Sequence, residues 1–474
     1  MREWELQRLA DAAGAELATG LAGHGQAHGI GAGTGGEGGR PMADPTGPRR
    51  AVIDSRTVGE GDLFVGLRGR SVDGGEHAAD ALRAGAWGVL VAPEHAEAAR
   101  AASTAGAVLV HADPLAALQA LALAWRRELG ARGAKVVGIT GSTGKTSTKD
   151  ILAALLGPHR RTVASPQNYN TEIGLPLALL SAPGDTQALV LEMAMRGPGQ
   201  IAELTTIAEP DVGVIVNVGP VHLGLLGTLE AIAAAKAELI AGMQAGSTVV
   251  VPVEDPLLAP HLRADLKTIT FGERADVTLA GVLSDGGVLI RAHGRELELQ
   301  PSFGQAHNLR NLLAATAAAL ALGVDPQGPL QVRFSALRGQ RLELAEGVVL
   351  IDDCYNANPM SMRAAIEDLA ESAPARRVAV LGDMLELGPQ APRLHREIGL
   401  YAAEQGLDLL VTVGPLAAEI RGEFEGESYA AGDAGAAAEL LAPLLQTGDT
   451  VLVKGSRGVG LERVAEALAS AQGR

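Results

Sequence analysis

The chain has few aromatic residues and almost no cysteine. Phe, Trp and Tyr together make up 3% of its 474 residues, so the core must be built from aliphatic side chains. Cys354 is the single cysteine, which excludes a disulfide within the chain and suits a reducing compartment. A chain of this length is expected to hold roughly two to four domains.

The sequence also lacks an excess of basic residues and any long apolar run. Lys and Arg number 39 against 55 Asp and Glu, and this net charge of -16 argues against binding to nucleic acid or to an anionic membrane. No apolar run is long enough to span a bilayer, and the opening M-R-E-W-E-L-Q-R-L carries charges where a signal peptide is apolar. We expect a cytoplasmic protein, not inserted in a membrane, that binds anionic substrates through single cations and helix ends.

Residues 135–150, K-V-V-G-I-T-G-S-T-G-K-T-S-T-K-D, have the pattern of a phosphate-binding loop. A short apolar run predicts a buried strand, glycines follow it, and a helix-forming segment comes next. In such a loop backbone N–H groups surround a polyphosphate, the lysine reaches the outer phosphates and the threonine hydroxyl ligates Mg²⁺. The loop is a variant, because Ile139 stands where the general pattern has its first glycine. We predict that a nucleoside triphosphate is bound by Gly141, Ser142, Thr143, Gly144, Lys145 and Thr146.

Alternating helix and strand signals predict an α/β protein of three domains. Residues 1–112 predict a small α/β domain with a flexible glycine-rich insert at about 23–40. Residues 113–333 predict a central domain with a largely parallel sheet and a small antiparallel excursion between 276 and 300. Residues 334–474 contain four apolar runs separated by helical segments, which is typical of a Rossmann-like domain. The absence of the G-x-G-x-x-G fingerprint argues against a nicotinamide enzyme.

Three residues of the central domain are candidates for chemistry. Glu192 ends the apolar run A-L-V-L and is placed to hold Mg²⁺, although a surface glutamate is the alternative. His222 follows a further predicted strand, and a lone histidine is usually structural. Lys236 falls within the apolar stripe of a helix capped by Thr228, where an unpaired ammonium is unfavourable. It must meet an anion, react with CO₂ to give a carbamate that ligates a second Mg²⁺ beside His222, or extend to the surface.

Polar clusters follow other predicted elements, and each has an ordinary structural alternative. Asn168 and Asn170 can orient a phosphate or substrate, or only form a turn. Asn308 and Asn311 share a helix face that suits an adenine edge, but helix capping by Asn308 is the interpretation that the local geometry favours. Two polar segments of the third domain end predicted strands and suggest a binding site: D-D-C-Y-N-A-N-P at 352–359 and K-G-S-R at 454–457.

Together these segments resemble the Mur ligases, the ATP-dependent amide-forming enzymes that build the peptide of peptidoglycan. The resemblance covers nearly the whole chain and rests on T-G-S-T-G-K-T, Glu192, His222 with Lys236, G-Q-A-H-N-L-R-N, and Arg341 before Asp353. Three segments are similar to the branch that adds D-alanyl-D-alanine to UDP-N-acetylmuramoyl-tripeptide: D-D-C-Y-N-A-N-P-M-S-M, L-G-D-M-L-E-L-G (381–388) and V-L-V-K-G-S-R. The D-N-P-R signature of the diaminopimelate- or lysine-adding branch is absent.

The resemblance implies a three-domain fold. The first domain would hold the UDP end of the substrate, the second would hold ATP, and the third would bring the dipeptide and close over the site. The catalytic residues would be Lys145, Glu192, His222 and a carbamylated Lys236, with two Mg²⁺ held by Thr146, Glu192, His222 and Lys236. Further nucleotide contacts would come from Asn308, Asn311, Arg341 and Asp353, which displaces the capping interpretation of Asn308. Substrate contacts would come from Ser55, Arg56, Asn168, Asn170, Tyr355, Asn356, Lys454, Ser456 and Arg457.

The implied reaction is the formation of an amide through an acyl phosphate, by an enzyme that we expect to be a monomer. ATP converts the carboxylate of the tripeptide to an acyl phosphate, and the amine of D-alanyl-D-alanine then displaces phosphate, leaving UDP-N-acetylmuramoyl-pentapeptide and ADP. A sibling amide ligase, such as the tripeptide-forming Mur enzyme or folylpolyglutamate synthetase, is one alternative. A nucleotide-binding switch or scaffold without ligase activity is another.

The chain departs from the family pattern at several positions. The D-G-H-x-F stretch of the family reads D-G-G-E-H at 73–77, which changes the expected contacts near the uridine. Gly224 stands where an acidic residue is usual, Ala194 where glycine is usual, and Cys354 where serine is common. The glycine-rich insert has no counterpart in the pattern.

Overall fold

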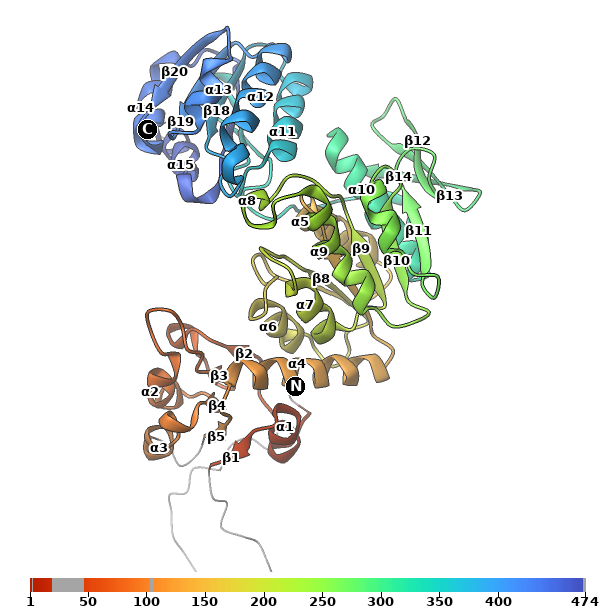
Figure 1. Ribbon diagram of the computed structural model, residues 1–474, viewed down its shortest axis with the longest axis vertical. Helices are drawn as coiled ribbons and strands as arrows, with labels where there is room; N and C mark the ends of the chain where they lie inside the picture. Colours follow the sequence, from red (N-terminus) through yellow and green to blue (C-terminus); the bar gives the residue numbers. More distant parts are fainter. Residues whose placement is uncertain (2, 19–46, 103–105, 472–474) are drawn as a thin grey trace, which may run out of the picture. The chain divides into compact units, whose positions relative to one another are not determined.

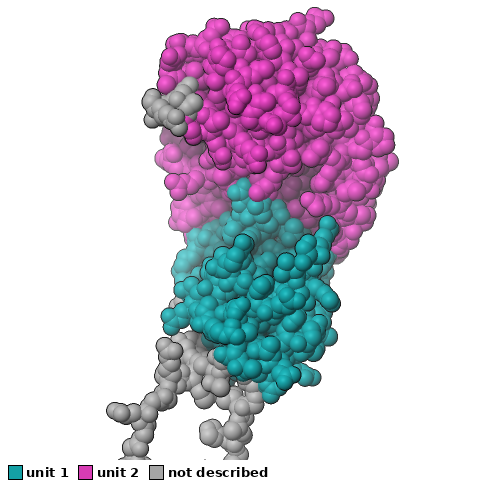
Figure 2. Space-filling model, turned by 90° about the vertical axis from the view of Figure 1, so that its left-hand side faces the viewer, with its two compact units in different colours: residues 1–136, 160–191, 203–209 teal, residues 137–159, 192–202, 210–474 magenta. Residues whose placement is uncertain are grey.

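The structure is a computed structural model that describes residues 1, 3–18, 47–102 and 106–471, so the predicted insert at about 23–40 lies outside the described residues. The chain forms two compact units (Figure 2). Unit 1 contains residues 1–136, 160–191 and 203–209, and unit 2 contains residues 137–159, 192–202 and 210–474. The predicted domain boundaries near 112 and 333 remain a prediction. Within the described ranges, no helix is both long enough and apolar enough to cross a bilayer.

The first sheet lies in unit 1 and has the strand order β1-β5-β4-β3-β2 (Figure 1). Its strands are β1 (Glu16–Leu17), β2 (Ala51–Val52), β3 (Leu63–Val65), β4 (Gly88–Val91) and β5 (Ala107–Val110). Only β1 is antiparallel to its neighbour. The helical segments are α1 (Leu6–Ala13), η1 (Ser55–Thr57), η2 (Gly74–His77), α2 (Ala78–Arg83), α3 (Pro93–Ala102) and α4 (Pro114–Ala131). The core is largely aliphatic, as the composition predicts, with Phe64 buried among valines and alanines.

The second sheet has ten strands in the order β15-β14-β13-β12-β11-β10-β9-β6-β8-β7. They are β6 (Lys135–Thr140), β7 (Thr162–Ala164), β8 (Ala188–Glu192), β9 (Val212–Ile215), β10 (Thr248–Pro252), β11 (Lys267–Phe271), β12 (Val277–Val282), β13 (Val288–Ala292), β14 (Arg295–Pro301) and β15 (Gly328–Leu330). The pairs β12–β13 and β13–β14 are antiparallel, which confirms the predicted excursion between 276 and 300. Every residue of β6 after Lys135 is buried, as in a parallel strand covered on both faces.

Helices follow the strands of this sheet in the order that the sequence predicts. They are α5 (Lys145–Leu156), α6 (Gly174–Ser181), α7 (Gln200–Ala208), α8 (Leu223–Leu226), α9 (Leu229–Gly242), the short η3 (Pro256–His261) and α10 (Ala306–Ala321). Thr228 caps α9 by accepting a hydrogen bond from the N–H of Ala231, as predicted. The alanine-rich helix α10 packs against α5 and against β9–β12, because its small side chains allow close approach.

The third sheet lies in unit 2 and has six strands in the order β16-β17-β21-β18-β19-β20. They are β16 (Gln340–Glu343), β17 (Val349–Asp352), β18 (Arg377–Gly382), β19 (Leu409–Val413), β20 (Glu427–Ala431) and β21 (Thr450–Lys454), and only β16 is antiparallel to its neighbour. The sequence predicts the four apolar strands but not β16 and β20. These two are edge strands without an apolar run, and all four residues of β16 are exposed.

Helical segments surround the third sheet, and Figure 1 shows α11 beside α12 in this part of the chain. They are η4 (Ala345–Gly347), α11 (Pro359–Ser372), η5 (Gly388–Gln390), α12 (Ala391–Glu404), α13 (Ala417–Gly422), α14 (Ala434–Leu441), η6 (Ala442–Leu444), η7 (Arg457–Val459) and α15 (Glu462–Ala471). Parallel strands place their carboxyl ends at one edge of a sheet, where ligands of α/β proteins bind. The predicted site residues of the last two sheets come from such ends.

Candidate active site

The segment G-S-T-G forms a tight loop between β6 and α5. Gly144 has a φ of 75°, and a Cβ atom added there would lie 2.4 Å from Oδ1 of Asn311, so only glycine fits. The backbone N–H groups of Ser142 and Thr143 donate to Oδ1 of Asn217 over 3.1 and 2.9 Å. The loop is therefore held by a side chain that follows β9, at a fixed distance from the start of α5.

Sequence reasoning missed Asn217, although a signal was present. The run D-V-G-V-I-V-N-V is apolar apart from its first residue and this one amide. A polar residue placed where a buried strand ends faces the ligand edge of the sheet. Asn217 also donates from Nδ2 to Oγ1 of Thr143 over 3.0 Å, so it uses both ends of its amide to fix the loop.

Lys145 begins α5 and folds back over the loop. Its Nζ donates to the carbonyl oxygen of Gly141 over 2.9 Å. Burial lowers the pKa of its ammonium, and the positive charge of Arg338 lowers it further, whereas the charge of Glu192 raises it. A poorly hydrated cation at the positive end of a helix is suited to bind an anion.

Thr146 and Glu192 lie side by side, each with 5% of its surface exposed. Oγ1 of Thr146 donates to Oε2 of Glu192 over 2.8 Å, so the last residue of β8 meets the first turn of α5. A hydroxyl oxygen and a carboxylate oxygen at this separation are the hard oxygen donors that Mg²⁺ prefers. The donor set therefore fits a magnesium ion next to the phosphate loop.

His222 precedes α8 and has a φ of 53°, in the left-handed region where few non-glycine residues lie. Its Nδ1 contacts Oε2 of Glu386, a residue of the third-sheet region that sequence reasoning assigned no role. The N–H of Gly224 also donates to the carbonyl oxygen of Glu386 over 3.0 Å. Burial lowers the pKa of the imidazole, the contact with Glu386 raises it, and the charges of Lys145 and Lys236 lower it.

Lys236 is buried in α9, with 2% of its surface exposed, as the apolar stripe predicts. Burial lowers the pKa of its amine well below the ordinary value of 10.5, and the charge of Lys145 adds to that effect. The alternative of a lysine that extends to the surface is therefore wrong, because the side chain is enclosed.

Asn308 and Asn311 lie inside α10 and are almost fully buried. Nδ2 of Asn311 donates to Oδ1 of Asn308 over 3.3 Å, and Asn311 reaches Gly144 of the phosphate loop. The N-cap of α10 is Gln305, so the interpretation of Asn308 as the helix cap is wrong. The strand-to-helix turn begins earlier than expected, which moves both amides into the first turns of the helix.

The polar segments of the third sheet meet at the carboxyl ends of β17 and β21. Nζ of Lys454, which is 1% exposed, contacts Oδ2 of Asp353 over 2.5 Å and donates to the carbonyl oxygen of Asn356 over 3.1 Å. The ring of Tyr355 lies under the guanidinium of Arg338 at 3.9 Å and that of Arg457 at 5.7 Å. The structure thus brings together the residues that sequence analysis selected from two segments about 100 positions apart.

Arg341, which was expected to contact the nucleotide, is paired instead with residues of α11. Arg341 donates to Oδ1 and Oδ2 of Asp368 over 2.8 and 3.0 Å and to Ser372 over 2.8 Å, so it is held on α11. Arg338 instead donates from Nη2 to Oγ1 of Thr146 over 3.3 Å. The residue beside the phosphate loop is therefore Arg338, which sequence analysis did not select.

The predicted substrate residues of unit 1 lie in loops and short helices. Arg56 donates to both carboxylate oxygens of Asp54, over 2.9 and 2.7 Å, and its side chain is largely exposed beside Ser55 in η1. Asn168 has a φ of 70° and, with Asn170, precedes α6. The side chain of His95 occupies the space beside Gly75. A Cβ atom added at Gly75 would lie 2.1 Å from Cδ2 of His95.

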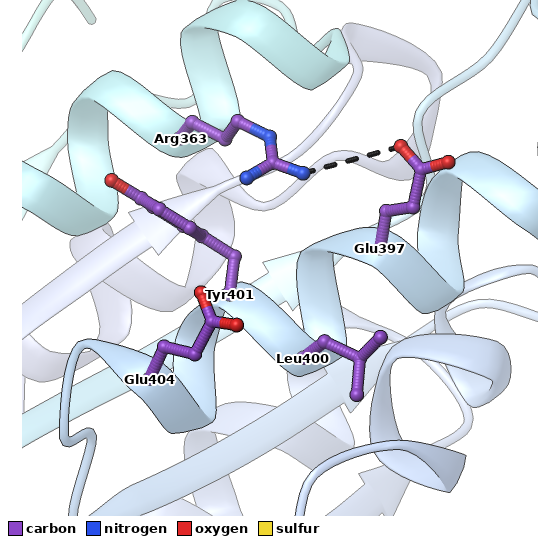
Figure 3. A pocket seen from close by; sticks show the side chains of 5 residues that line it. All are labelled: Arg363, Glu397, Leu400, Tyr401 and Glu404. Carbon is purple, nitrogen blue, oxygen red and sulfur yellow. Dashed lines mark ion pairs between the residues drawn. The ribbon is translucent and has the colours of Figure 1, made fainter.

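A hollow between α11 and α12 contains none of the predicted site residues (Figure 3). Arg363 lies over the ring of Tyr401 at 4.6 Å and 4.0 Å from a carboxylate oxygen of Glu397. The cation of this hollow is already paired with a carboxylate and an aromatic ring. We therefore place the candidate active site at the phosphate loop.

Comparisons with known proteins show which family the chain is similar to. Residues 51–126 match the family described as Mur ligase family, catalytic domain. Residues 139–319 match the Mur ligase middle domain, and residues 337–457 match the Mur ligase glutamate ligase domain. A protein of Mycobacterium tuberculosis named UDP-N-acetylmuramoyl-tripeptide–D-alanyl-D-alanine ligase is 37% identical over 464 residues, which cover 88% of this chain and 91% of that protein. The chain belongs to the Mur ligase family.

Other Mur ligases are similar over comparable lengths. A Synechocystis protein with the same name is 40% identical over 427 residues, covering 88% of this chain and 90% of its own. A crystal structure of MurF ligase from Thermotoga maritima in complex with ADP is 32% identical, with a TM-score of 0.76, and covers 90% of this chain and 98% of the other. The resemblance found in the sequence and the expected three-domain α/β fold class are confirmed.

Proposed function

We propose that this Mur ligase uses ATP to join D-alanyl-D-alanine to UDP-N-acetylmuramoyl-tripeptide, as a cytoplasmic monomer that contributes to peptidoglycan synthesis. The relatives from Mycobacterium tuberculosis and Synechocystis carry the name of that activity, and both align with 88% of this chain. The residues that surround the phosphate loop are the observation on which the proposal rests. The phosphate loop is bordered by Thr146 with Glu192 and by the lysines Lys145 and Lys236, a set that suits phosphoryl transfer to a carboxylate.

The reaction begins with transfer of a phosphoryl group from ATP to the carboxylate of the tripeptide. A bond forms between a carboxylate oxygen and the γ-phosphorus, and the bond from that phosphorus to ADP breaks. The loop N–H groups and Lys145 offset the negative charge that both reactants bring. The amine of D-alanyl-D-alanine then attacks the acyl carbon, loses a proton and releases phosphate.

Mg²⁺ would be held by Thr146 and Glu192, with His222 at a second position. The hydroxyl and carboxylate oxygens that lie 2.8 Å apart support the first assignment. When bound, the ion supplies positive charge next to the phosphate oxygens. Nδ1 of His222 already contacts Glu386, which leaves Nε2 as the ring atom for a metal, an arrangement common at metal sites.

Lys236 would carry a carbamate. Its lowered pKa favours the neutral amine, which is the form that attacks the carbon of CO₂ and then loses a proton to solvent. The product is an anion in a place where Lys145 contributes nearby positive charge. Modification would thereby place an anion beside the positive charge of Lys145, in a position where an ammonium is unfavourable.

The remaining predicted residues divide among the UDP-linked substrate, the nucleotide and the dipeptide. Ser55 and Arg56 would contact the UDP end, with Asn168 and Asn170 as further substrate contacts. Asn308, Asn311, Arg341 and Asp353 would contact the nucleotide. The carboxyl ends of β17 and β21 would receive the dipeptide through Tyr355, Asn356, Lys454, Ser456 and Arg457. The exposed guanidinium of Arg56 and the cations near Tyr355 support this division.

The test is ADP release with ATP, Mg²⁺ and UDP-N-acetylmuramoyl-tripeptide, with and without D-alanyl-D-alanine. Tripeptides with diaminopimelate and with lysine are both used, and the product is identified by mass spectrometry as the pentapeptide. We expect release that depends on the dipeptide. Release with a free diamino acid and the UDP-dipeptide instead would identify a sibling ligase. Binding of ATP without any acceptor-dependent turnover would indicate a switch or scaffold.

A further inference from the structure

We propose that Arg338 is a catalytic residue that contacts the γ-phosphoryl group of ATP, an inference that rests on the proposed ligase function. Arg338 lies between β15 and β16, before the strand that carries Arg341. Its Nη2 is 3.3 Å from Oγ1 of Thr146, the hydroxyl that also donates to Glu192. In phosphate-binding loops this threonine lies beside the outer phosphates, so the guanidinium is within reach of the group that is transferred.

The guanidinium has hydrogen-bonding capacity that the described residues do not use. It carries five N–H donors in a fixed plane. One face of that plane lies on the ring of Tyr355 at 3.9 Å, and one edge donates to Thr146. Nε is buried and has no hydrogen-bond partner among the described residues. A buried N–H without an acceptor is unfavourable, and phosphate oxygens are acceptors that match the planar fork of an arginine.

The charges around Arg338 also indicate an anion. Its charge acts on Lys145, so two cations lie close to each other near the loop. Glu192 is the carboxylate whose charge acts on the same lysine, and it is also the partner of Thr146. Glu192 supplies one negative charge against these two cations, so a positive charge remains that a further anion can offset. A triphosphate with several negative charges is such an anion.

The backbone holds Arg338 in this position. Leu337 and Gly339, on either side of it, have φ values of 61° and 67°. A left-handed conformation is uncommon for leucine and indicates a segment fixed by its surroundings. The carbonyl oxygen of Leu337 accepts from the N–H of Tyr355 over 3.3 Å, and its N–H donates to Oε1 of Gln340 over 3.3 Å. The same residue, Tyr355, therefore fixes both the backbone before Arg338 and the plane of its side chain.

The role follows from the charge that changes during the transfer. As the bond to ADP lengthens and the carboxylate oxygen approaches the γ-phosphorus, negative charge spreads over the phosphoryl oxygens and the ADP oxygen. The guanidinium of Arg338, which lies beside Thr146, offsets that charge. It transfers no proton, because arginine stays protonated. Arginines that act in this way in other phosphoryl-transfer enzymes raise kcat by about 10³- to 10⁵-fold.

The experiment compares Arg338→Ala, Arg338→Lys and a matched control, Arg333→Ala, which removes an exposed arginine from the same connecting segment. We expect Arg338→Ala to lower kcat for dipeptide-dependent ADP release by at least about 100-fold. The KM for ATP should rise by about tenfold at most, which is less than the loss in kcat, since the contact strengthens during the transfer. Arg338→Lys should recover only part of kcat because lysine lacks the planar fork. Arg333→Ala should match the wild type.

A binding measurement separates a phosphate contact from a purely structural one. In calorimetric titrations we expect Arg338→Ala to weaken a non-hydrolysable ATP analogue by about tenfold and to leave ADP affinity nearly unchanged. Equal weakening of both nucleotides would overturn the proposal and assign Arg338 to packing. Activity within about threefold of the wild type would also overturn it. If Arg338→Ala does not fold, the affinities for ADP and for the ATP analogue are compared with Arg338→Gln and Arg338→Lys.

The failure of this inference differs from the failure of the proposed function. A wild-type protein without dipeptide-dependent ADP release would refute the ligase assignment. The comparison of ADP with the ATP analogue would still decide whether Arg338 contacts the terminal phosphate. Conversely, the wild type and the Arg338→Ala variant could prove equally active. That result would leave the ligase assignment intact and refute the catalytic role of Arg338.

Discussion

Replacing Lys236 by Met should change how the stability of the central domain depends on pH. Lys236 is 2% exposed, and its folded-state pKa lies well below 10.5 because the amine is buried and lies near the charge of Lys145. Between the folded pKa and 10.5 the unfolded chain therefore binds a proton that the folded chain does not. Stability must rise with pH in that window, by about 1.4 kcal/mol per pH unit at most. Below the folded pKa both states are protonated and this dependence ends.

The Lys236→Met variant keeps the apolar stem of the side chain and loses the amine, so it loses this slope. Relative to the variant, the unmodified wild type should become less stable by about 1.4 kcal/mol for each unit that the pH falls within the window. The comparison is made in CO₂-free buffer, because a carbamate would replace the amine. Lys267→Met, at the exposed first residue of β11, controls for the change in net charge.

The choice of assay follows from where the tryptophans lie. Trp4, Trp87 and Trp125 are the three tryptophans of the chain and all belong to unit 1, whereas Lys236 belongs to unit 2. Tryptophan fluorescence therefore does not report directly on α9. Amide hydrogen exchange of α9, followed by mass spectrometry from pH 7 to 10 and corrected for the intrinsic rate, gives the local opening free energy. Parallel pH dependences in wild type and Lys236→Met would refute the assignment of a buried, neutral amine.

The activity of a Lys236 variant tests the carbamate separately. Lys236→Ala leaves a space in α9 where a small carboxylic acid can take the place of the proposed carbamate. We expect Lys236→Ala to lack ligase activity and to recover part of it when acetate or propionate is added. The Lys236→Met side chain fills the space, so the same acids should have no effect on that variant. Full activity of Lys236→Ala without added acid would remove the carbamate from the mechanism.

Three further variants test the loop and its surroundings. Lys145→Ala should lower kcat by at least about 100-fold while the protein stays folded by circular dichroism, and retained acceptor-dependent ADP release would contradict its role. Asn217→Ala removes the acceptor of two loop N–H groups and should destabilise unit 2 by about 1–3 kcal/mol in urea unfolding. An unchanged unfolding midpoint together with an unchanged ATP affinity would show that the loop keeps its conformation without Asn217. Glu386→Gln weakens the contact that orients His222, so it should lower kcat by a larger factor than it lowers the affinity for ATP. An unchanged kcat would show that this contact has no role in the reaction.

The parts of the site that could be predicted lie at the ends of apolar runs. Glu192 is the last residue of β8, Lys145 begins α5, and Asp353 and Lys454 belong to the ends of β17 and β21. In a parallel α/β sheet the carboxyl ends of the strands face ligands, so a local pattern indicates a position in space. The buried strands could also be predicted. Both faces of such a strand are covered by apolar side chains, so the strand appears in the sequence as a continuous apolar run.

The parts that could not be predicted depend on contacts between distant segments. Asn217 meets residues about 75 positions away, and Glu386 meets His222 across 164 positions. The amide at the end of its apolar run places Asn217 at the ligand edge but does not indicate which residues it meets, and no local pattern marks Glu386, because a carboxylate near a turn is ordinary. Edge strands such as β16 are exposed on both faces and carry no apolar periodicity. The predicted cap at Asn308 was wrong because the backbone turns at Gln305, where no capping side chain marks the start of the helix.

The register of β16 explains why Arg338, and not Arg341, lies beside the phosphate loop. Residues of β16 pair in antiparallel register with β17, with Arg341 opposite Ile351. Side chains alternate along a strand, and Arg341 is on the face that meets Asp368 and Ser372 of α11. Transfer of its guanidinium to the loop would require those contacts to break or the register to slip by one residue, which turns every side chain of the strand over. Arg338 precedes the strand, so the turn formed by Leu337 and Gly339 sets its direction independently of that pairing. A contact of Arg341 with the nucleotide therefore requires release from α11, whereas Arg338 needs only an acceptor for the N–H groups it already presents.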